Sequence, residues 1–299
     1  MSQASLTEVA AQQRMAILAL VAGALAIAFA PIFVRLSETG PAATAFWRVA
    51  LAVPVLMVLA HRARPGLRTD VPVRLPVILC GLFFAVDIGV WHYSIEYTTV
   101  ANAALLANLA PVFVALAAWA FFGEHITRLF ILGMTLAIIG AALLTGASFR
   151  LDPQQVYGDM FGVLTAVFYG AYQLSVARLR RLHAALSIMA WSSLFSALGL
   201  LFGAILLGEN LLPQTAAGWS VLLGIALISQ VGGQTLITYA FAHLPVSFSS
   251  VSLLIHPIMS ALLAWLLLGE VLTWSHLLGA TVILAGIYLA RRGSRGNCA

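Results

Sequence analysis

Ten long apolar runs dominate the sequence and restrict its fold more than any other feature. Each run has about 20 residues, the length at which an α-helix crosses a hydrocarbon core of about 30 Å. A helix also satisfies its own backbone hydrogen bonds, as that environment requires. The runs cover 15–36, 42–60, 75–95, 98–121, 128–147, 158–178, 185–207, 218–241, 245–268 and 274–291. We therefore predict an all-α membrane protein with ten transmembrane helices, the first being a span and not a cleaved signal peptide.

The composition agrees with this class and excludes several others. Apolar residues make up 62% of the chain and charged residues only 8%, too few for a soluble protein of 299 residues. No basic stripe is interleaved with exposed aromatic residues, so we expect no nucleic-acid partner. Phosphate-binding, zinc-protease and nucleophile-elbow motifs are missing, so we expect no cofactor, metal or enzymatic activity. Cys80 lies at membrane depth and Cys298 in the C-terminal tail, so they do not pair.

The basic residues predict an orientation. All 15 are arginines. With the N-terminus inside, the inner loops hold Arg14, Arg62, Arg64, Arg68, Arg74, Arg128, Arg178, Arg180, Arg181, Arg291, Arg292 and Arg295. The outer loops hold only Arg35 and Arg150. Because positive loop charge stays on the cytoplasmic side, we expect an inner-membrane protein with both termini cytoplasmic.

One stretch of the chain occurs twice. Val100–Leu143 and Val246–Leu289 align without a gap. Matching positions include Pro111 and Pro257, Trp119 and Trp265, Gly123-Glu124 and Gly269-Glu270, Thr127 and Thr273, Gly133 and Gly279, and Gly140 and Gly286. The copies lie five spans apart, so the second crosses the bilayer in the opposite direction. Such inverted repeats are typical of secondary transporters, which bind substrate between the halves.

The same residues carry a family resemblance. Tyr93-x-Ile95 leading into Pro111, Gly123-Glu124, Gly133 and Gly140 resembles the second part of an EamA repeat. Tyr239-x-Phe241, Pro257, Gly269-Glu270, Gly279 and Gly286 resemble it again. The chain is thus similar to the ten-helix exporters of the drug/metabolite transporter superfamily, most of all to the YddG-type exporters of aromatic amino acids. The resemblance implies two five-helix repeats, 15–147 and 158–291, joined by a linker at 148–157.

Two prolines lie inside predicted spans. Pro111 and Pro257 cannot donate to the carbonyls of Ala107 and Leu253, which then need another partner or a wet cavity. We predict paired hinges beside the substrate path, against the alternative of two ordinary kinks. Asn108 and His256 are next to these prolines and are predicted to line the same space.

The other repeated residues favour structural roles. Gly133 and Gly140, like Gly279 and Gly286, lie two turns apart and predict close packing of the fifth and tenth spans. Glu124 and Glu270 are expected to cap the helix that follows each of them, or its connecting turn.

Buried polar and aromatic residues indicate the substrate path. Asp87 lies near the middle of the third span, where an acid usually faces the bundle interior or water, and Trp91 follows on the same face. Substrate or proton binding competes there with a structural role. Gln230, Gln234 and Thr238 are spaced by four residues in the eighth span, with interhelical hydrogen bonding as the alternative to substrate contact.

Further residues complete the predicted site. Tyr172 belongs to an aromatic stripe in the sixth span, for which packing is the alternative, and Trp191 lies deep in the seventh. Arg48 in the second span has three interpretations: snorkelling outward, pairing with an acid, or holding a substrate carboxylate. We predict substrate contacts at Asp87, Trp91, Asn108, Tyr172, Trp191, Gln230, Gln234 and His256.

These residues favour a secondary transporter or facilitator that exports small amphipathic metabolites by alternating access. Amino acids, aromatic ones above all, suit the aromatic content. An exporter of cationic drugs stays open because of Asp87, and a membrane-embedded enzyme acting on a lipid-like substrate is a third alternative. The expected partners are a small-molecule substrate and the lipid bilayer. The sequence leaves the oligomeric state open, with a monomer as one option.

Overall fold

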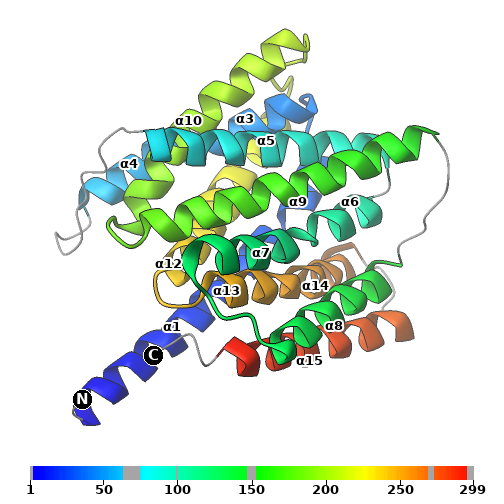
Figure 1. The fold of residues 1–299 in the computed structure, drawn as a ribbon. Coiled ribbons are helices and arrows are strands. Elements are labelled where there is room, and N and C mark those ends of the chain that lie inside the picture. The colour runs from blue at the N-terminus through cyan, green and yellow to red at the C-terminus, as the bar shows by residue number, and fades with distance from the viewer. Residues whose placement is uncertain (1–2, 63–74, 99, 147–152, 269–272, 295–299) are drawn as a thin grey trace.

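The protein is a bundle of membrane-length helices (Figure 1). The computed structural model describes residues 3–62, 75–98, 100–146, 153–268 and 273–294, and within these ranges it contains helices and no strands. Ten candidate spans are long and apolar enough to cross a membrane. They cover Ala11–Arg35, Pro41–Arg62, Leu75–Tyr97, Asn102–Phe122, Arg128–Thr145, Val156–Leu179, Ala185–Leu206, Ala216–Ala240, Val246–Leu263 and Trp274–Gly293. The prediction of ten transmembrane helices is confirmed.

Five spans are single helices and the other five are divided. The single helices are α5 (Leu75–Tyr97), α8 (Arg128–Thr145), α9 (Pro153–Leu179), α10 (Ala185–Leu206) and α15 (Trp274–Ser294). The divided spans are α1 (Gln3–Ile27) with α2 (Ala30–Arg35), α3 (Pro41–Ala50) with α4 (Ala52–Arg62), α6 (Val100–Ala107) with α7 (Ala110–Phe122), α11 (Ala216–Gly224) with the π-helix η1 (Ile225–Gln234) and α12 (Thr235–Ala240), and α13 (Val246–Ser252) with the 3₁₀ turn η2 (Leu253–Ile255) and α14 (His256–Leu268).

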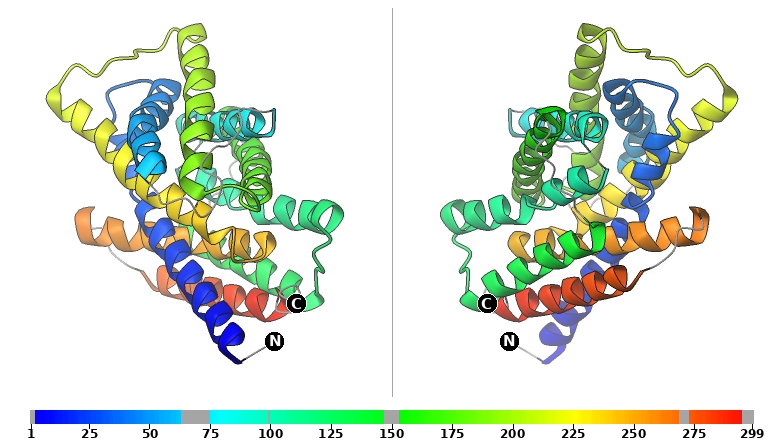
Figure 2. Two further views of the ribbon diagram at one scale, coloured as in Figure 1. Left: turned by 90° about the vertical axis from the view of Figure 1, so that its left-hand side faces the viewer. Right: turned by 90° about the vertical axis from the view of Figure 1, so that its right-hand side faces the viewer.

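The helix α8 packs along α15 at one edge of the bundle (Figures 1 and 2). A Cβ atom added at Gly133 would lie 2.3 Å from the Ala290 nitrogen, and one at Gly286 would lie 2.5 Å from the Ala137 nitrogen. Only glycine permits this backbone approach, so the predicted close packing of the fifth and tenth spans is confirmed.

Elsewhere, helices far apart in the sequence lie side by side. The helix α1 packs on η1 and α12, and α9 packs on α5. The helix α10 packs on α3, α4 and α5, while α7 contacts α13. The start of α1 and the end of α15 lie at the same end of the bundle (Figure 2).

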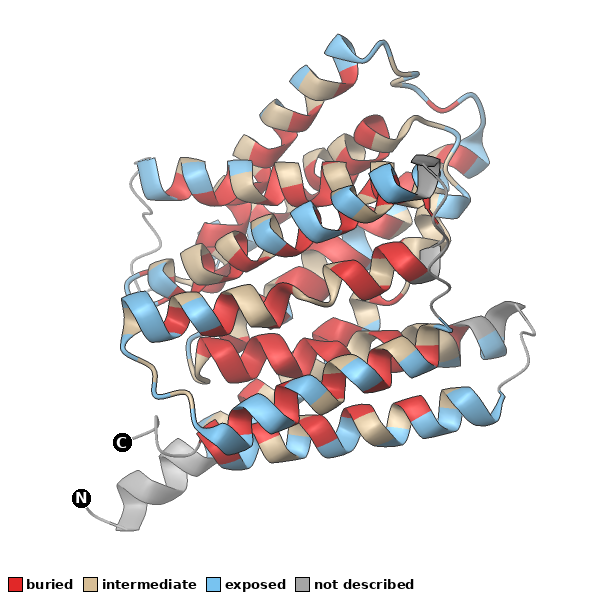
Figure 3. Cartoon of the chain, turned by 45° about the vertical axis from the view of Figure 1, so that its right-hand side comes forward, coloured by how far each residue is buried: buried red, intermediate tan, exposed pale blue. Residues whose placement is uncertain are grey.

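Figure 3 shows the buried residues along the inward faces of the helices and the exposed residues on their outer faces; the buried set is mostly apolar but includes polar side chains. Large apolar side chains such as Phe121, Leu284 and Tyr288 point outward and are more than half exposed. Buried polar side chains include Arg48 and Asp87, both in the interior. An apolar perimeter, with the buried polar side chains kept inside the bundle, suits a protein surrounded by lipid, and the chain is a multi-pass membrane protein.

Candidate functional site

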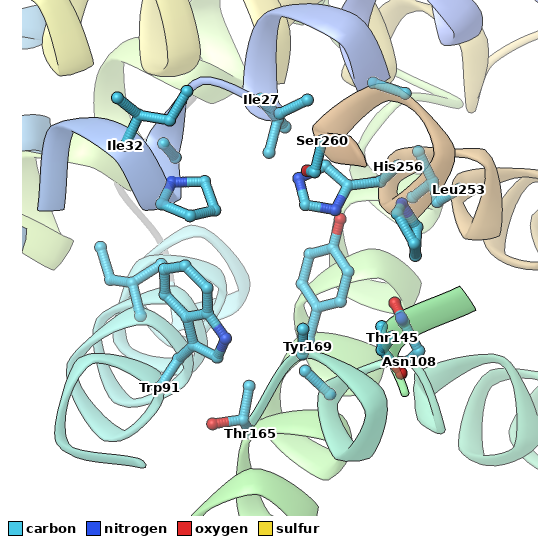
Figure 4. A pocket seen from close by; sticks show the side chains of 18 of the residues that line it. Ile27, Ile32, Trp91, Asn108, Thr145, Thr165, Tyr169, Leu253, His256 and Ser260 are labelled. Carbon is cyan, nitrogen blue, oxygen red and sulfur yellow. The ribbon is translucent and has the colours of Figure 1, made fainter. Parts of the chain in front are cut away.

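A cavity of about 610 Å³ lies among the spans. Its wall takes residues from α1, α2, α3, α5, α6, α9, η1, α12, η2 and α14, and from the ends of α8 and α15. Figure 4 shows Trp91 and Tyr169 on opposite sides of the space, with His256 and Ser260 close to the tip of Tyr169. The volume falls within the range of about 300–1,000 Å³ that is typical of small-molecule sites.

Two opposite charges line the cavity. Arg48 of α3 is 4% exposed and Asp87 of α5 is 5% exposed. They attract each other electrostatically but form no direct ion pair. None of the hydrogen bonds among the described residues uses the Asp87 carboxylate. The Arg48 Nε atom donates to Gln230 Oε1 at 3.3 Å, and Phe84 lies beneath the guanidinium, with its ring centroid 5.8 Å from Cζ.

Polar atoms without partners surround the rest of the cavity. The lining residues Asn108, Thr165, His256 and Ser260 each have a buried side-chain atom with no hydrogen-bond partner. Their unpartnered atoms are Asn108 Nδ2, Thr165 Oγ1, His256 Nε2 and Ser260 Oγ. Because leaving such groups unpaired is costly, the cavity is built to contact water or a polar ligand.

Three proline-associated breaks open onto this space. Pro31 follows the break between α1 and α2, Pro111 follows the break between α6 and α7, and Pro257 follows η2. Pro31 cannot donate to the Ile27 carbonyl, and the His256 side chain interacts with that carbonyl instead. The Leu253 carbonyl, left free by Pro257, accepts from the His256 backbone N–H. The breaks predicted at Pro111 and Pro257 are present, and Pro31 adds one that the sequence analysis missed.

One end of the cavity is lined by residues at the ends of spans. Arg35 and Leu36 end the first span, Thr145 ends α8, and His276 lies in the first turn of α15. Two acids tie the loops at this end together. Glu38 accepts from the N–H groups of Gln214 and Thr215 before α11 (2.9 and 3.1 Å), and Glu209 accepts from those of Ala42 and Ala43 in α3 (3.1 and 2.8 Å). Hydrogen bonding, first from the Thr215 hydroxyl, lowers the pKa of Glu38.

The opposite end is tied by Glu124. Its carboxylate accepts from the Val246 N–H at 3.0 Å and from the Ser247 hydroxyl, at the start of α13. The prediction that Glu124 caps the following helix or its connecting turn is therefore wrong. Thr127 caps α8 by accepting from the Phe130 N–H at 3.1 Å, which leaves Glu124 free to reach α13. The equivalent prediction for Glu270 lies outside the described residues.

A buried arginine reinforces this end. Arg180 donates from Nε to the Thr238 carbonyl at 3.2 Å and from Nη1 to the His183 carbonyl. Burial lowers the pKa of Arg180 from its ordinary value. The pKa of His243 is also lowered, mainly by burial and secondly by the positive charge of Arg180. Arg180 therefore joins the end of α9 to α12, a contact that loop-charge counting did not reveal.

The structure brings together five of the eight residues predicted to contact substrate. Asp87, Trp91, Asn108, Gln234 and His256 line the cavity, as does the predicted hinge residue Pro257. Pro111 is buried beside its break and does not line the cavity.

The other three residues lie behind the wall. Tyr172 is fully buried and stacks on the lining residue Phe84, with ring centroids 4.5 Å apart. Gln230 accepts a hydrogen bond from Arg48 and does not line the cavity. The prediction that Gln230 and Gln234 share one face assumed the spacing of an α-helix, and the π-helix η1 changes that spacing. Trp191 packs in a separate cluster with Val77 and Ile188. Its depth in the span therefore did not predict which neighbours its side chain contacts.

Several lining residues were not among the predicted contacts. They are Arg48, Phe84, Thr165, Tyr169 and Ser260. The sequence did indicate that Arg48 faces a polar environment, since a cation inside a span is costly unless it does. The four-residue spacing of Thr165 and Tyr169 was a weaker indication that both face the same space. Among the described residues, no group of three or more His, Cys, Asp or Glu side chains is placed to hold a metal ion.

Comparisons with known proteins agree with a membrane transporter. The EamA-like transporter family matches residues 14–146 and 156–292. The pseudopaline exporter CntI of Pseudomonas aeruginosa is 28% identical over 87% of this chain and 89% of its own length. A probable terminal-alkyne amino-acid exporter of Streptantibioticus cattleyicolor is 31% identical over 91% of both chains. A probable amino-acid metabolite efflux pump of Salmonella typhimurium is 27% identical over 76% of this chain and 80% of its own. One crystal structure shares the fold, with a TM-score of 0.75 and 19% identity over 94% of this chain and 98% of the other.

Proposed function

Because this chain belongs to the EamA-like transporter family, we propose that it exports small amphipathic amino acids, with aromatic ones favoured. The observation that carries this proposal is the cavity, in which opposite charges and the aromatic side chains of Phe84, Trp91 and Tyr169 line one space. Aromatic walls suit a substrate with an apolar body and a charged end. The two relatives named for amino acids or their metabolites support the same substrate class.

Alternating access between two five-span repeats is the proposed mechanism. The repeats are 15–147 and 158–291, with 148–157 as a linker, and the family matches the chain in two parts with similar limits. The packing of α1 on η1 and α12 has a counterpart in the packing of α9 on α5, as an inverted repeat requires. Pro111 and Pro257 act as the paired hinges, beside breaks in the spans that surround the substrate.

The arginine distribution supports an orientation with both termini cytoplasmic in the inner (plasma) membrane. The cavity end at Arg35 and His276 then faces outward, and the end tied by Glu124 faces the cytoplasm. The structure in this assignment is the outward-open state, from which an exporter releases its substrate.

Within the site, Asp87, Trp91, Asn108, Gln234 and His256 contact the substrate directly. Tyr172 supports Phe84 from behind, and Gln230 acts through Arg48. Trp191 is proposed to stabilise the seventh span rather than to bind substrate.

A cationic-compound exporter is the second candidate. It is favoured by the Asp87 carboxylate, which lines the cavity without a hydrogen-bond partner among the described residues. Against it stands Arg48 on the same cavity, because a positive charge repels a cation.

Transport by the purified protein in liposomes tests the proposal. The vesicles are loaded separately with labelled phenylalanine, tryptophan, threonine or a cationic dye, with and without a pH gradient. We expect the aromatic amino acids to leave fastest. Release of the dye alone would support the cationic candidate, and retention of every solute by folded protein would refute transport. An Asp87→Asn variant with unchanged pH dependence would exclude Asp87 as a proton carrier.

A further inference from the structure

The Arg48 guanidinium has unused hydrogen-bonding capacity inside the cavity. Its Nε atom donates to Gln230, but no hydrogen bond among the described residues uses either terminal nitrogen. An arginine side chain is always charged and carries donors in a planar fork that matches a carboxylate. A guanidinium that is 4% exposed and lines a cavity is thus suited to an incoming anion.

Other side chains fix the direction of this guanidinium. Gln230 accepts from Arg48 Nε through its amide oxygen and donates from Nε2 to Ser193 Oγ at 3.2 Å. Ser193 and Gln230 are fully buried, so the chain of contacts is shielded from solvent. Gln230 belongs to the π-helix η1, an irregularity that occurs frequently at functional sites. Phe84 covers one face of the guanidinium.

Asp87 supplies the complementary charge without neutralising Arg48 directly. The two side chains line one cavity and attract each other, yet they form no direct ion pair. Charges held apart at this depth are costly unless other groups compensate them. A single ligand with adjacent negative and positive groups would compensate both at once.

We propose that Arg48 and Asp87 form a receptor for the zwitterionic end of an α-amino acid. The Arg48 guanidinium binds the carboxylate and the Asp87 carboxylate binds the ammonium group, while Phe84, Trp91 and Tyr169 surround the side chain. This inference rests on the proposed export of amino acids and identifies the groups that select them. A ligand lacking either charged group leaves one of the two protein charges uncompensated.

Three probes that share a phenyl ring separate the two charges. Phenylalanine carries both groups, 2-phenylethylamine lacks the carboxylate, and 3-phenylpropionate lacks the ammonium group. Binding of each is measured with purified wild-type protein and with the Arg48→Gln, Arg48→Lys and Asp87→Asn variants. Arg178→Gln, which removes an arginine at the end of α9, is the matched control.

We expect Arg48→Gln to weaken phenylalanine and 3-phenylpropionate binding about tenfold or more, since a charged hydrogen bond is lost. Binding of 2-phenylethylamine should be unchanged or tighter. Asp87→Asn should show the opposite preference between the two single-charge probes. Arg48→Lys should restore only part of the phenylalanine affinity, because lysine lacks the fork.

Comparing probes within one variant separates recognition from misfolding, which would weaken all three together. Equal loss of all probes in Arg48→Gln, or no loss of phenylalanine binding, would overturn the proposal while wild-type transport still supports amino-acid export. If the folded wild-type protein neither binds nor moves phenylalanine, the proposed function and this inference both fail.

Discussion

Replacing Glu124 with alanine should weaken closure at the end of the cavity that lies opposite Arg35. The Glu124 carboxylate accepts from the Val246 N–H at 3.0 Å and from the Ser247 hydroxyl, and these contacts hold the start of α13 against the end of α7. A hydrogen bond to a charged group contributes about 1.5–3 kcal/mol. Glu124 is half-buried, so we use about 2 kcal/mol for the whole contact after allowing for competition by water.

The consequence for transport follows from the state in which this contact forms. If it exists only while the Arg35 end is open, its loss moves the equilibrium by about 2 kcal/mol, or about 30-fold, toward the opposite state. A reagent entering from the Arg35 end should then reach the cavity more slowly.

Cysteine accessibility measures this shift. Cys80 is replaced by alanine and Cys298 by serine, and one cysteine is introduced at Ser260 in the cavity wall. A membrane-impermeant thiol reagent is then added to oriented vesicles from the Arg35 side. We expect slower labelling after Glu124→Ala. Glu38→Gln is the matched control, because that acid binds the loop before α11 at the other end.

Unchanged labelling of folded Glu124→Ala, both from the Arg35 side and from the opposite side, would refute the reasoning. A shift of about 30-fold must lower the population open to the first side or raise the population open to the second. It would mean that Glu124 stabilises α13 equally in both states. Slower labelling in both Glu124→Ala and Glu38→Gln would point to a general loss of structure and would also count against a directional effect.

The remaining predictions concern the helix seam, the loop acids and the aromatic wall. Gly133→Ala should destabilise the protein by about 1–3 kcal/mol, because the added Cβ meets the α15 backbone. Gly203→Ala is the control and should not destabilise it, since a Cβ there meets nothing within 4 Å. Thermal unfolding in detergent measures both. Because the pKa of Glu38 is lowered, its stabilising contact with the loop before α11 is complete above the ordinary value of 4.5 and is lost as pH falls through the lowered value. Glu38→Gln should therefore reduce the acid sensitivity of unfolding. Trp91→Ala should reduce the ratio of phenylalanine to leucine export about fivefold, from loss of about 1 kcal/mol of aromatic contact.

The spans and their ends were predictable because lipid imposes one length and one kind of backbone structure. The close approach of α8 and α15 was likewise predictable from Gly133, Gly140, Gly279 and Gly286, whose spacing leaves few other interpretations. These features depend on local periodicity, which a single sequence displays directly.

The site was only partly predictable because its assembly depends on how each helix is rotated and what it meets. Nothing local indicates that Glu124 bonds Val246, a partner 122 positions away. The π-helix separates Gln230 from the cavity wall, although a spacing of four residues had grouped it with Gln234. Arg48 signalled a polar environment, but its direction is set by packing against α5, α10 and η1.

The broken spans explain how such an apolar chain builds a polar site. Each proline removes a backbone donor, so a carbonyl inside the bilayer must find another partner or water. The break preceding Pro31 and the turn preceding Pro257 are neighbours on the cavity wall, and His256 contacts both. Its ring interacts with the Ile27 carbonyl, and its backbone N–H donates to the Leu253 carbonyl. The polar groups at these two breaks therefore gather at one place, away from lipid. The positions at which the backbone is least constrained are also the positions that line the cavity, so bending a span at a break would change the shape of the site itself.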